Sequence, residues 1–597
     1  MKKRIALLLA ALMLTGCAAN TTTETTANPE TAPAETAAAV ETTPVETIPA
    51  PEYVSRFDTV TEITLSDDGI TVDGGEETDT VFTSNDIIYY EDKDFYSSGN
   101  PYGEGEAHER HSTDAAAAHT VVNITAPGAY RVSGKLSAGQ IRVDLGDDAY
   151  DDPNAVVELI LDNADITCTV APTILFLNTY ECDGEWDVTT AQPTVDTTAA
   201  GANLILEGTS TVSGSYVAKI FKDADGEKKL WKQDGAIYSY MSMNVFGPGA
   251  LTLNAANEGL DTELHLTING GDIAIRSGND GINTNEDGVS VTTINGGTLH
   301  IIAGLGEEGD GIDSNGYLVI NGGTVVSSAN PAGDAGLDSD MGSYVNGGTV
   351  IALGSTMDWA ESDSDQVTMN LQFADYQSNG SAIVVTREDG TVIFAYDPTE
   401  DEVLGKDTRR YQGAILSSPS FVQGETYYVF LDGTVTGTET GGVYETVTAY
   451  DGGIQQMYTG TDVTMGGRGM GNRGGMGAKG EMPEGMEIPE DDRKGFAGGE
   501  MPEDFTLPEG ETMPEGGFGG GRGGEKPEDF DGEMPQGMSG ERPALPDGET
   551  MPADFDPSTM GDRGSMRQTG EKNGSSNTVF YMQDKVNCFS GVTAVTE

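Results

Sequence analysis

The sequence predicts an all-β protein that consists mainly of a right-handed parallel β-helix, a solenoid of stacked coils, followed by a small antiparallel β module. Three observations lead to this prediction. An Asn-Gly-Gly motif recurs at a nearly constant spacing, short β-branched runs alternate with polar residues between the motifs, and glycine supplies 81 of the 597 residues, about twice its ordinary share. A repeat of this length cannot enclose a hydrophobic core alone, so successive repeats must stack on one another.

Two motifs alternate through the central region and define the repeat. Asn-Gly-Gly begins at residues 269, 295, 321 and 346, so successive copies are 26, 26 and 25 residues apart. The second motif places a glycine and an aliphatic residue before Asp or Asn, as in Asp280–Thr284 and Asp310–Ser314. Related copies are Glu258–Thr262 and Ala335–Ser339. We interpret the Asn-Gly-Gly asparagines as structural corners whose amides hydrogen-bond along the stack.

Composition divides the chain into six segments. The N-terminal apolar run is too short to span a bilayer and is typical of a secretory signal, while the Thr/Ala/Pro-rich and Gly/Met/Pro/Glu-rich stretches cannot bury a core. The predicted segments are 1–17 for the signal segment with its cysteine, 18–52 for a disordered stalk, 53–358 for the β-helix, 359–464 for the antiparallel module, 465–574 for a disordered acidic segment and 575–597 for a terminal strand that packs back on the fold.

The end of the signal segment predicts a membrane anchor. Lys2, Lys3 and Arg4 precede the apolar run, which ends in Leu14-Thr15-Gly16-Cys17. This ending resembles the lipobox of bacterial lipoproteins, which implies cleavage before Cys17 and attachment of a lipid to its sulfur. We therefore expect an extracytoplasmic protein held at the cell surface by that lipid; the alternative is an ordinary signal with an incidental cysteine.

The net charge excludes several classes of partner. With 31 basic and 98 acidic residues the formal charge is −67, so the protein repels nucleic acids and anionic lipid surfaces, and divalent cations are the expected small partners. No phosphate-binding loop or nucleophile motif occurs, so neither a nucleotide nor acyl-transfer chemistry is expected.

The acidic residues of the repeats predict a calcium site. Stacking aligns the acidic motifs into columns of neighbours about 4.8 Å apart, and carboxylates at that spacing need a counter-charge. Oxygen atoms from Asp, Glu, Asn and flexible turns suit Ca²⁺; the alternative is a set of solvated Asx turns. The candidate metal ligands are Glu258, Asp261, Asp280, Asn283, Asp310, Asp313, Asp334, Asp338 and Asp340.

Three further cysteines carry less information. Cys168 and Cys182 lie in one region and Cys588 stands alone near the C-terminus. An exported protein can hold a disulfide between the first two, but isolated buried cysteines are equally consistent with the sequence.

Several segments together resemble a known family. These are Ile63–Asp73, Asp234–Ser239, the coil motifs and Phe580–Asn587. They are similar to the bacterial family of carbohydrate-binding β-helix lipoproteins. The resemblance implies a pectate-lyase-like fold, bound calcium and affinity for cellulose or polygalacturonate. The long Met-Pro-Glu-Gly insertion and Cys588 depart from the family pattern.

The residues and the resemblance together predict a non-catalytic protein that binds a polysaccharide. Calcium can join an acidic protein to an acidic polyuronate such as polygalacturonate, whereas a neutral polymer such as cellulose needs aromatic faces. The candidate aromatic residues are Tyr238, Tyr240, Tyr317, Tyr344 and Trp359. One alternative is a calcium-dependent polysaccharide lyase, for which Arg276 is a weak candidate base. The other is a structural or adhesive surface rod.

Overall fold

The computed structural model describes residues 53–90, 102–104, 109–184, 187–221, 230–355, 358–378, 380–399, 409–461 and 576–595. Cys17, the predicted stalk (18–52) and the whole of the predicted acidic segment (465–574) lie outside the described residues. Within them, the helices are the short α1 (Thr113–Ala117) and a 3₁₀ turn, Asp147–Asp151, and all other regular elements are strands. The all-β prediction is confirmed. No helix of the described part is both long and apolar enough to cross a membrane.

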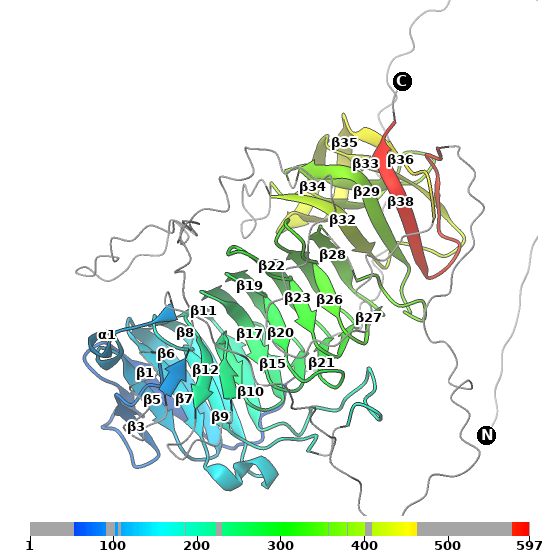
Figure 1. The fold of residues 1–597 in the computed structure, drawn as a ribbon. Coiled ribbons are helices and arrows are strands. Elements are labelled where there is room, and N and C mark those ends of the chain that lie inside the picture. The colour runs from blue at the N-terminus through cyan, green and yellow to red at the C-terminus, as the bar shows by residue number, and fades with distance from the viewer. Residues whose placement is uncertain are drawn as a thin grey trace, which may run out of the picture. The chain divides into compact units, whose positions relative to one another are not determined.

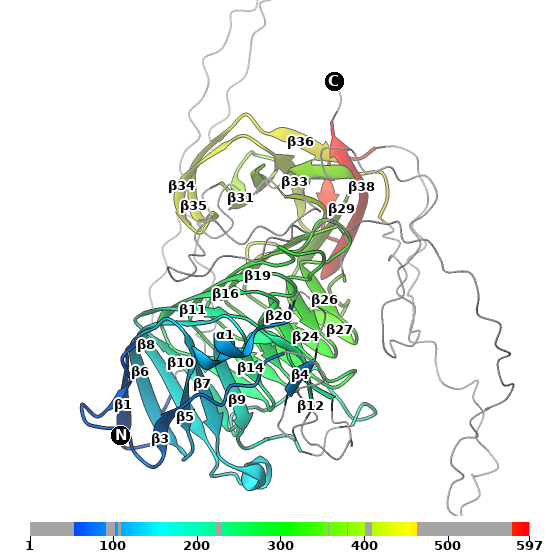
Figure 2. The same cartoon turned by 60° about the vertical axis from the view of Figure 1, so that its left-hand side comes forward.

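The coils contribute strands to three ladders in which equivalent strands of successive coils pair in parallel (Figures 1 and 2). This is the pairing that a parallel β-helix requires; its right-handed winding stays a prediction. The first ladder contains β1 (Val60–Leu65), β6 (Gly128–Leu136), β8 (Val157–Cys168), β10 (Ala202–Glu207), β15 (Met243–Phe246), β18 (Leu266–Ile268), β21 (Val291–Ile294), β24 (Tyr317–Ile320) and β27 (Gly342–Val345), and β2 (Thr71–Val72) pairs antiparallel to β1.

The second ladder begins at β11 (Thr209–Gly214), which pairs with β8 of the first ladder. The third ladder lies beside the first and second ladders. The second contains β11, β16 (Ala250–Ala255), β19 (Asp272–Ser277), β22 (Thr298–Ile302), β25 (Thr324–Ser328) and β28 (Thr349–Gly354). The third contains β5 (Thr120–Ile124), β7 (Gly139–Asp144), β9 (Ile174–Asn178), β14 (Gly235–Ser239), β17 (Glu258–Thr262), β20 (Ile282–Thr284), β23 (Ile312–Ser314) and β26 (Leu337–Ser339), and β3 (Val81–Ser84) pairs antiparallel to β5.

The core consists of columns of aliphatic side chains that point inward from the ladders. In the third ladder Leu260, Ile282 and Ile312 occupy one register position and are fully buried. The same core joins residues of all three ladders. Each coil therefore depends on its neighbours for burial, as the repeat length predicts.

The glycine of the acidic motif is required by the close approach of adjacent coils. A Cβ on Gly281 would lie 2.5 Å from the carbonyl oxygen of Gly311 and 2.3 Å from a methyl carbon of Ile301. Only a residue without a side chain fits there, so this glycine lets the chain beside Asp280 approach the next coil closely.

The Asn-Gly-Gly asparagines form a hydrogen-bonded column, which confirms their structural role. The Asn295 amide donates to the Asn269 side-chain oxygen at 2.9 Å, the Asn321 amide donates to that of Asn295 at 2.9 Å, and the Asn346 amide donates to that of Asn321 at 3.0 Å. The backbone N–H of Asp365 completes the column by donating to the Asn346 oxygen.

Replacement of Asn295 by alanine is expected to lower the free energy of unfolding by about 1–3 kcal/mol, because two amide hydrogen bonds of about 0.5–1.5 kcal/mol each are lost. Urea denaturation measures this. The exposed strand residue Thr252 provides the control, since Thr252→Ala is expected to change stability by less than about 0.5 kcal/mol. Equal effects of the two substitutions would contradict the prediction.

A small sheet and a C-terminal module complete the fold. A separate sheet contains β4 (Tyr102–Glu104), β12 (Val217–Phe221) and β13 (Leu230–Gln233) (Figure 2). The C-terminal module contains β29 (Thr368–Ser378), β30 (Ile383–Thr386), β31 (Val392–Tyr396), β32 (Arg410–Ser417), β33 (Thr426–Leu431), β34 (Thr434–Thr440), β35 (Val443–Asp451), β36 (Ile454–Met457), β37 (Phe580–Tyr581) and β38 (Val586–Ala594).

The module continues from the last coil by strand pairing. β32 pairs antiparallel with both β28 and β29, and the C-terminal strand β38 returns to pair with β29 (Figure 1). A second hydrophobic core joins Ile302, Val326 and Ile351 of the coils to residues of the module. The pairing covers the edge of β28, which would otherwise be open.

Candidate functional site

The acidic motifs place one row of polar side chains on the outer side of the third ladder. Asp261, Asn283, Asp313 and Asp338 pair with one another in that order through the parallel register. Their neighbours in each strand point inward to the core, because side chains alternate along a strand. We call these four residues the outer row; neighbouring strands set its spacing at about 4.8 Å.

A second row lies where the chain enters these strands. It consists of Glu258, Asp280 and Asp310, which we call the entry row. The Asp280 carboxylate accepts the backbone N–H of Asp310 at 2.6 Å, and the Asp310 carboxylate accepts that of Ala335 at 2.6 Å. The Asp334 carboxylate accepts the N–H of Gly309 at 3.0 Å. Each of these carboxylates therefore bonds to the backbone of a neighbouring coil as well as adding charge to the row.

The two rows run from a buried end to a solvent-accessible end. At β17, Asp261 is 0% exposed and Glu258 is 4% exposed. At β23 and β26, by contrast, Asp310, Asp313 and Asp338 are half-buried, and the nearby Asp340 is exposed. A large ligand can reach the carboxylates only at this second end.

Burial and mutual repulsion raise the pKa values of these carboxyl groups. Burial and then the charge of Glu258 raise the pKa of Asp261 well above its ordinary value, and the same two causes raise that of Asp280. Burial, followed by the charges of Asp338 and Asp313, raises the pKa of Asp310. Their charged forms are therefore costly without a cation nearby.

A lysine that the sequence analysis missed lies at the buried end. The Nζ atom of Lys232, on β13, is 3.3 Å from a carboxylate oxygen of Asp234. Burial opposes its charge, but the negative charges of Glu258 and three other acidic groups raise the pKa of Lys232 well above its ordinary value. The sequence offered one indication of this contact. Lys232 lies two residues before Asp234, and Asp234 begins a motif of the same type as the acidic repeats.

Several buried oxygen atoms at this end accept no hydrogen bond. They are the second carboxylate oxygens of Asp234, Glu258 and Asp261 and the side-chain amide oxygens of Gln233, Asn283 and Asn285. The described residues contain no group of three or more His, Cys, Asp or Glu side chains placed as a metal site. Any cation bound here would thus also need amide, backbone, water or ligand oxygens.

The predicted aromatic residues fall into two groups. Tyr238 is fully buried with its hydroxyl donating to Glu263, Tyr240 is half-buried against it at 5.1 Å between ring centres, and Trp359 belongs to the core at 8% exposure. The rings of Tyr238 and Trp359 therefore offer no open face to a sugar. Tyr317 and Tyr344, on β24 and β27, are half-buried with ring centres 6.3 Å apart.

Arg276 lies in a different ladder from the two rows. It belongs to β19 in the second ladder, where its register neighbours are Asn254 and Ile302. Although it precedes Asp280 by four residues in sequence, the chain turns into another ladder between them.

The three cysteines of the described region are free. Burial raises the pKa of the Cys168 and Cys182 thiols to about 12, so both stay protonated at neutral pH. The sequence left open a disulfide between Cys168 and Cys182 or isolated cysteines, and the structure contains isolated cysteines.

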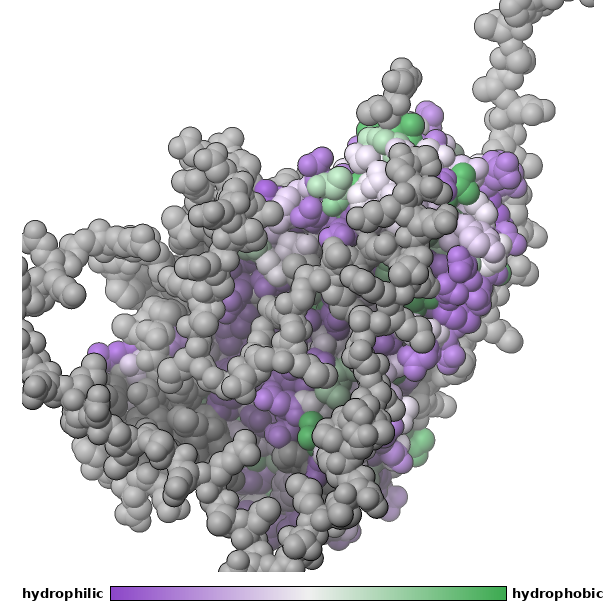
Figure 3. Space-filling model, turned by 45° about the vertical axis from the view of Figure 1, so that its right-hand side comes forward, coloured by the Kyte–Doolittle hydropathy of each residue, from purple (hydrophilic) through white to green (hydrophobic). Residues whose placement is uncertain are grey.

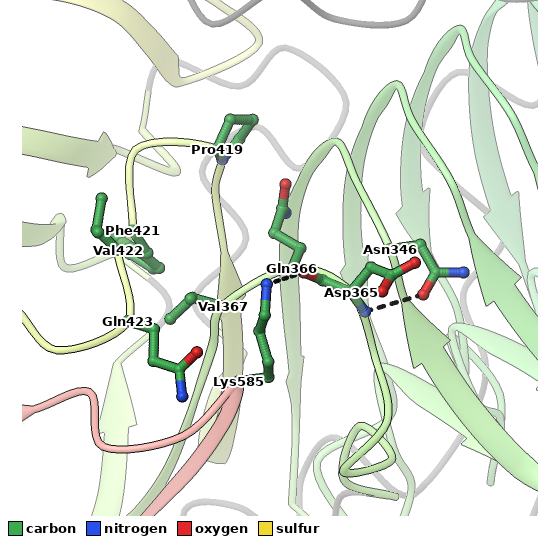
Figure 4. Close-up of a pocket in the computed structure, with 9 residues that line it drawn as sticks. All are labelled: Asn346, Asp365, Gln366, Val367, Pro419, Phe421, Val422, Gln423 and Lys585. Atoms are coloured by element: carbon green, nitrogen blue, oxygen red, sulfur yellow. Dashed lines mark hydrogen bonds between the residues drawn. The ribbon is translucent and has the colours of Figure 1, made fainter.

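A pocket of about 440 Å³ lies between the last asparagine corner and the module (Figure 4). Lys585 enters it and donates to the backbone oxygen of Asp365, while the Gln366 amide is already bonded to Gly348 and Ser417. None of the predicted site residues lines this pocket. On the face in Figure 3 hydrophilic residues predominate, and the hydrophobic ones form small separate spots.

Comparison with known proteins supports carbohydrate binding. Residues 118–368 match the model of a family described as carbohydrate-binding domain-containing protein, and this segment contains both acidic rows. The match supports carbohydrate binding in general for this part of the chain. A solved structure of a polysaccharide lyase-like protein from C. thermocellum, determined as a gadolinium derivative, is 21% identical in sequence to this chain. The matched region covers 49% of this chain and 93% of the C. thermocellum chain, and the two superimpose with a TM-score of 0.29. No curated protein matches the chain.

Proposed function

We propose that this protein is a non-catalytic polysaccharide-binding protein in which calcium joins the acidic rows to the carboxylates of a polyuronate such as polygalacturonate. The family match over residues 118–368 carries the carbohydrate-binding part of the proposal. The accessible end of the rows supports the calcium part, because an acidic polymer and a protein of charge −67 repel each other unless cations lie between them.

The residues at the accessible end have the chemistry that calcium requires. Asp310, Asp313 and Asp338 would supply carboxylate oxygens, and Asn283, the buried register neighbour of Asp313 toward the other end of the row, has an amide oxygen that accepts no hydrogen bond. Calcium takes six to eight oxygen ligands in flexible geometry, so backbone, water and sugar oxygens would complete the set. The ion would supply the positive charge that both the rows and the polymer lack.

The half-buried rings of Tyr317 and Tyr344 support contact with sugar at the same end. Tyr317 follows Asp313 by four residues, at the start of the next strand of the same coil. Tyrosine offers both an apolar face and a hydroxyl, so this pair suits the ring of a sugar. Cellulose, which has no carboxylates, would depend on these rings alone.

We also propose that a lipid on Cys17 anchors the protein at the outer face of the cytoplasmic membrane. Residues 18–52 would then act as a spacer between the anchor and the coils. Mass spectrometry of Cys17 in the native protein tests this directly, and an unmodified Cys17 would overturn it.

Binding is tested with the chain that begins at Ala18. We expect insoluble polygalacturonate to retain it in calcium but not in chelator, and cellulose to retain it less and without calcium dependence. Retention on neither polymer would overturn the proposed function in favour of a structural rod. Release of unsaturated sugars from polygalacturonate would instead favour the lyase alternative.

The double variant Asp310→Asn/Asp313→Asn is expected to weaken calcium-dependent retention by at least about tenfold, or about 1.4 kcal/mol, because two carboxylates become neutral amides of the same shape. The matched control is Asp152→Asn, which removes a charge from an exposed site in another coil. A calcium titration of retention distinguishes the two. If both variants behaved alike, the accessible end would not be the calcium site.

A further inference from the structure

The buried end of the acidic rows already contains a cation that belongs to the chain. Lys232 is the next-to-last residue of β13 in the small sheet of β4, β12 and β13, and β14 of the third ladder begins three residues later, at Gly235. Its Nζ atom contacts Asp234 at 3.3 Å, and the charges of Glu258, Asp261 and Glu263 also act on it. One ammonium group thus lies among four carboxylates.

The oxygens around Lys232 outnumber the hydrogen bonds that it can donate. An ammonium group has three N–H donors and no acceptor. At this end Asp234, Glu258 and Asp261 each have a buried carboxylate oxygen that accepts no hydrogen bond. The buried amide oxygens of Gln233, Asn283 and Asn285 also accept none. Glu258 and Asp261 are 4% and 0% exposed, so bulk water does not satisfy them. This surplus of oxygen acceptors is the environment of a hard cation.

We propose that Lys232 is the resident cation of this buried site and that it excludes divalent cations from Asp234, Glu258 and Asp261. A second positive ion in the same small volume would be repelled by the ammonium group. Calcium would consequently enter only the accessible end of the rows, around Asp310 and Asp313. The assignment of calcium to that end rests on the proposed function, whereas the role of Lys232 does not.

Isothermal titration of the chain with calcium chloride tests the exclusion. Lys232→Met keeps the apolar stem of the side chain and removes its charge, so we expect it to bind one more calcium ion per chain than the unmodified protein. In chelator its melting temperature should fall, and added calcium should restore it. Lys232→Arg keeps the charge and should retain the original stoichiometry. A folded Lys232→Met protein that gains no calcium ion would overturn the proposal.

A second variant keeps the test decisive if Lys232→Met does not fold. Glu258→Gln/Asp261→Asn removes two of the carboxylates around Lys232 while preserving their shapes. Since calcium is excluded from this end, we expect its calcium stoichiometry to equal that of the unmodified protein and its stability in chelator to rise. Loss of a calcium ion in this variant would overturn the exclusion by Lys232.

The two proposals fail separately. If the unmodified protein binds no calcium but Lys232→Met gains one ion, the role of Lys232 is supported and calcium bridging at the accessible end is not. If the unmodified protein binds calcium and Lys232→Met binds no more, calcium bridging at the accessible end is supported and the role of Lys232 is not.

Discussion

An Ile282→Ala protein is expected to lose about 2–5 kcal/mol of its free energy of unfolding. The Ile282 side chain is fully buried in the middle of the third ladder, with Leu260 before it and Ile312 after it in the same register. The paired strands on both sides hold the coils apart, so the cavity left by the substitution cannot collapse easily. The lost contacts and the remaining cavity therefore both lower stability.

Urea denaturation followed by circular dichroism measures this loss. Val54→Ala provides the control, because it also shortens an aliphatic side chain but at a residue that is 79% exposed. That control is expected to change stability by less than about 0.5 kcal/mol. Comparable losses in the two proteins would mean that the aliphatic column does not hold the coils together.

An Asp358→Asn protein is expected to be more stable than the unmodified protein at pH 8 in chelator, by up to about 4 kcal/mol. Burial, which outweighs the hydrogen bond from Ser339, raises the pKa of Asp358 from 3.8 to about 7, and the charge of Asp338 adds to the rise. Each unit of such a shift corresponds to about 1.36 kcal/mol. Asparagine keeps an oxygen for Ser339 but carries no charge.

The pH dependence distinguishes this effect from a general one. Between pH 4 and 7 the folded protein keeps a proton on Asp358 that the unfolded chain has lost, so the native state binds more protons and stability falls as pH rises. Asp358→Asn should flatten this decline when melting temperature is measured from pH 4 to 8. Asp152 has its pKa lowered by hydrogen bonds from Asn154, so Asp152→Asn should leave the decline in place. An unchanged slope in Asp358→Asn would contradict the assignment.

The repeat spacing was sufficient to predict the ladders and the alignment within the outer row. Asn295 and Asn321 are neighbours because one repeat makes one coil, and the same relation places Asn283 beside Asp313. The Gly281 position follows from the same period, since its carbonyl neighbour is the glycine of the next copy. Periodicity of this kind is local information, and a single sequence contains it.

Other features of the site depend on parts of the chain that do not repeat. Lys232 reaches Asp234 and the charges of β17 from a separate small sheet, and no period relates it to them. Arg276 is close to Asp280 in sequence but lies in another ladder, because the chain turns a corner between them. Tyr238 shares its register position with Asp261, and both are fully buried, which the period alone does not reveal.

The sequence by itself therefore determined the all-β class, the stacking of repeats and the rows of acidic residues, because each follows from residue types at a constant interval. Only the tertiary structure decided which end of the rows is buried, which aromatic rings remain accessible and which cation lies among the carboxylates. These depend on how segments of irregular length, such as the one that contains Lys232, pack over the regular coils. Their positions are set by long-range contacts and charge compensation rather than by a repeating local pattern.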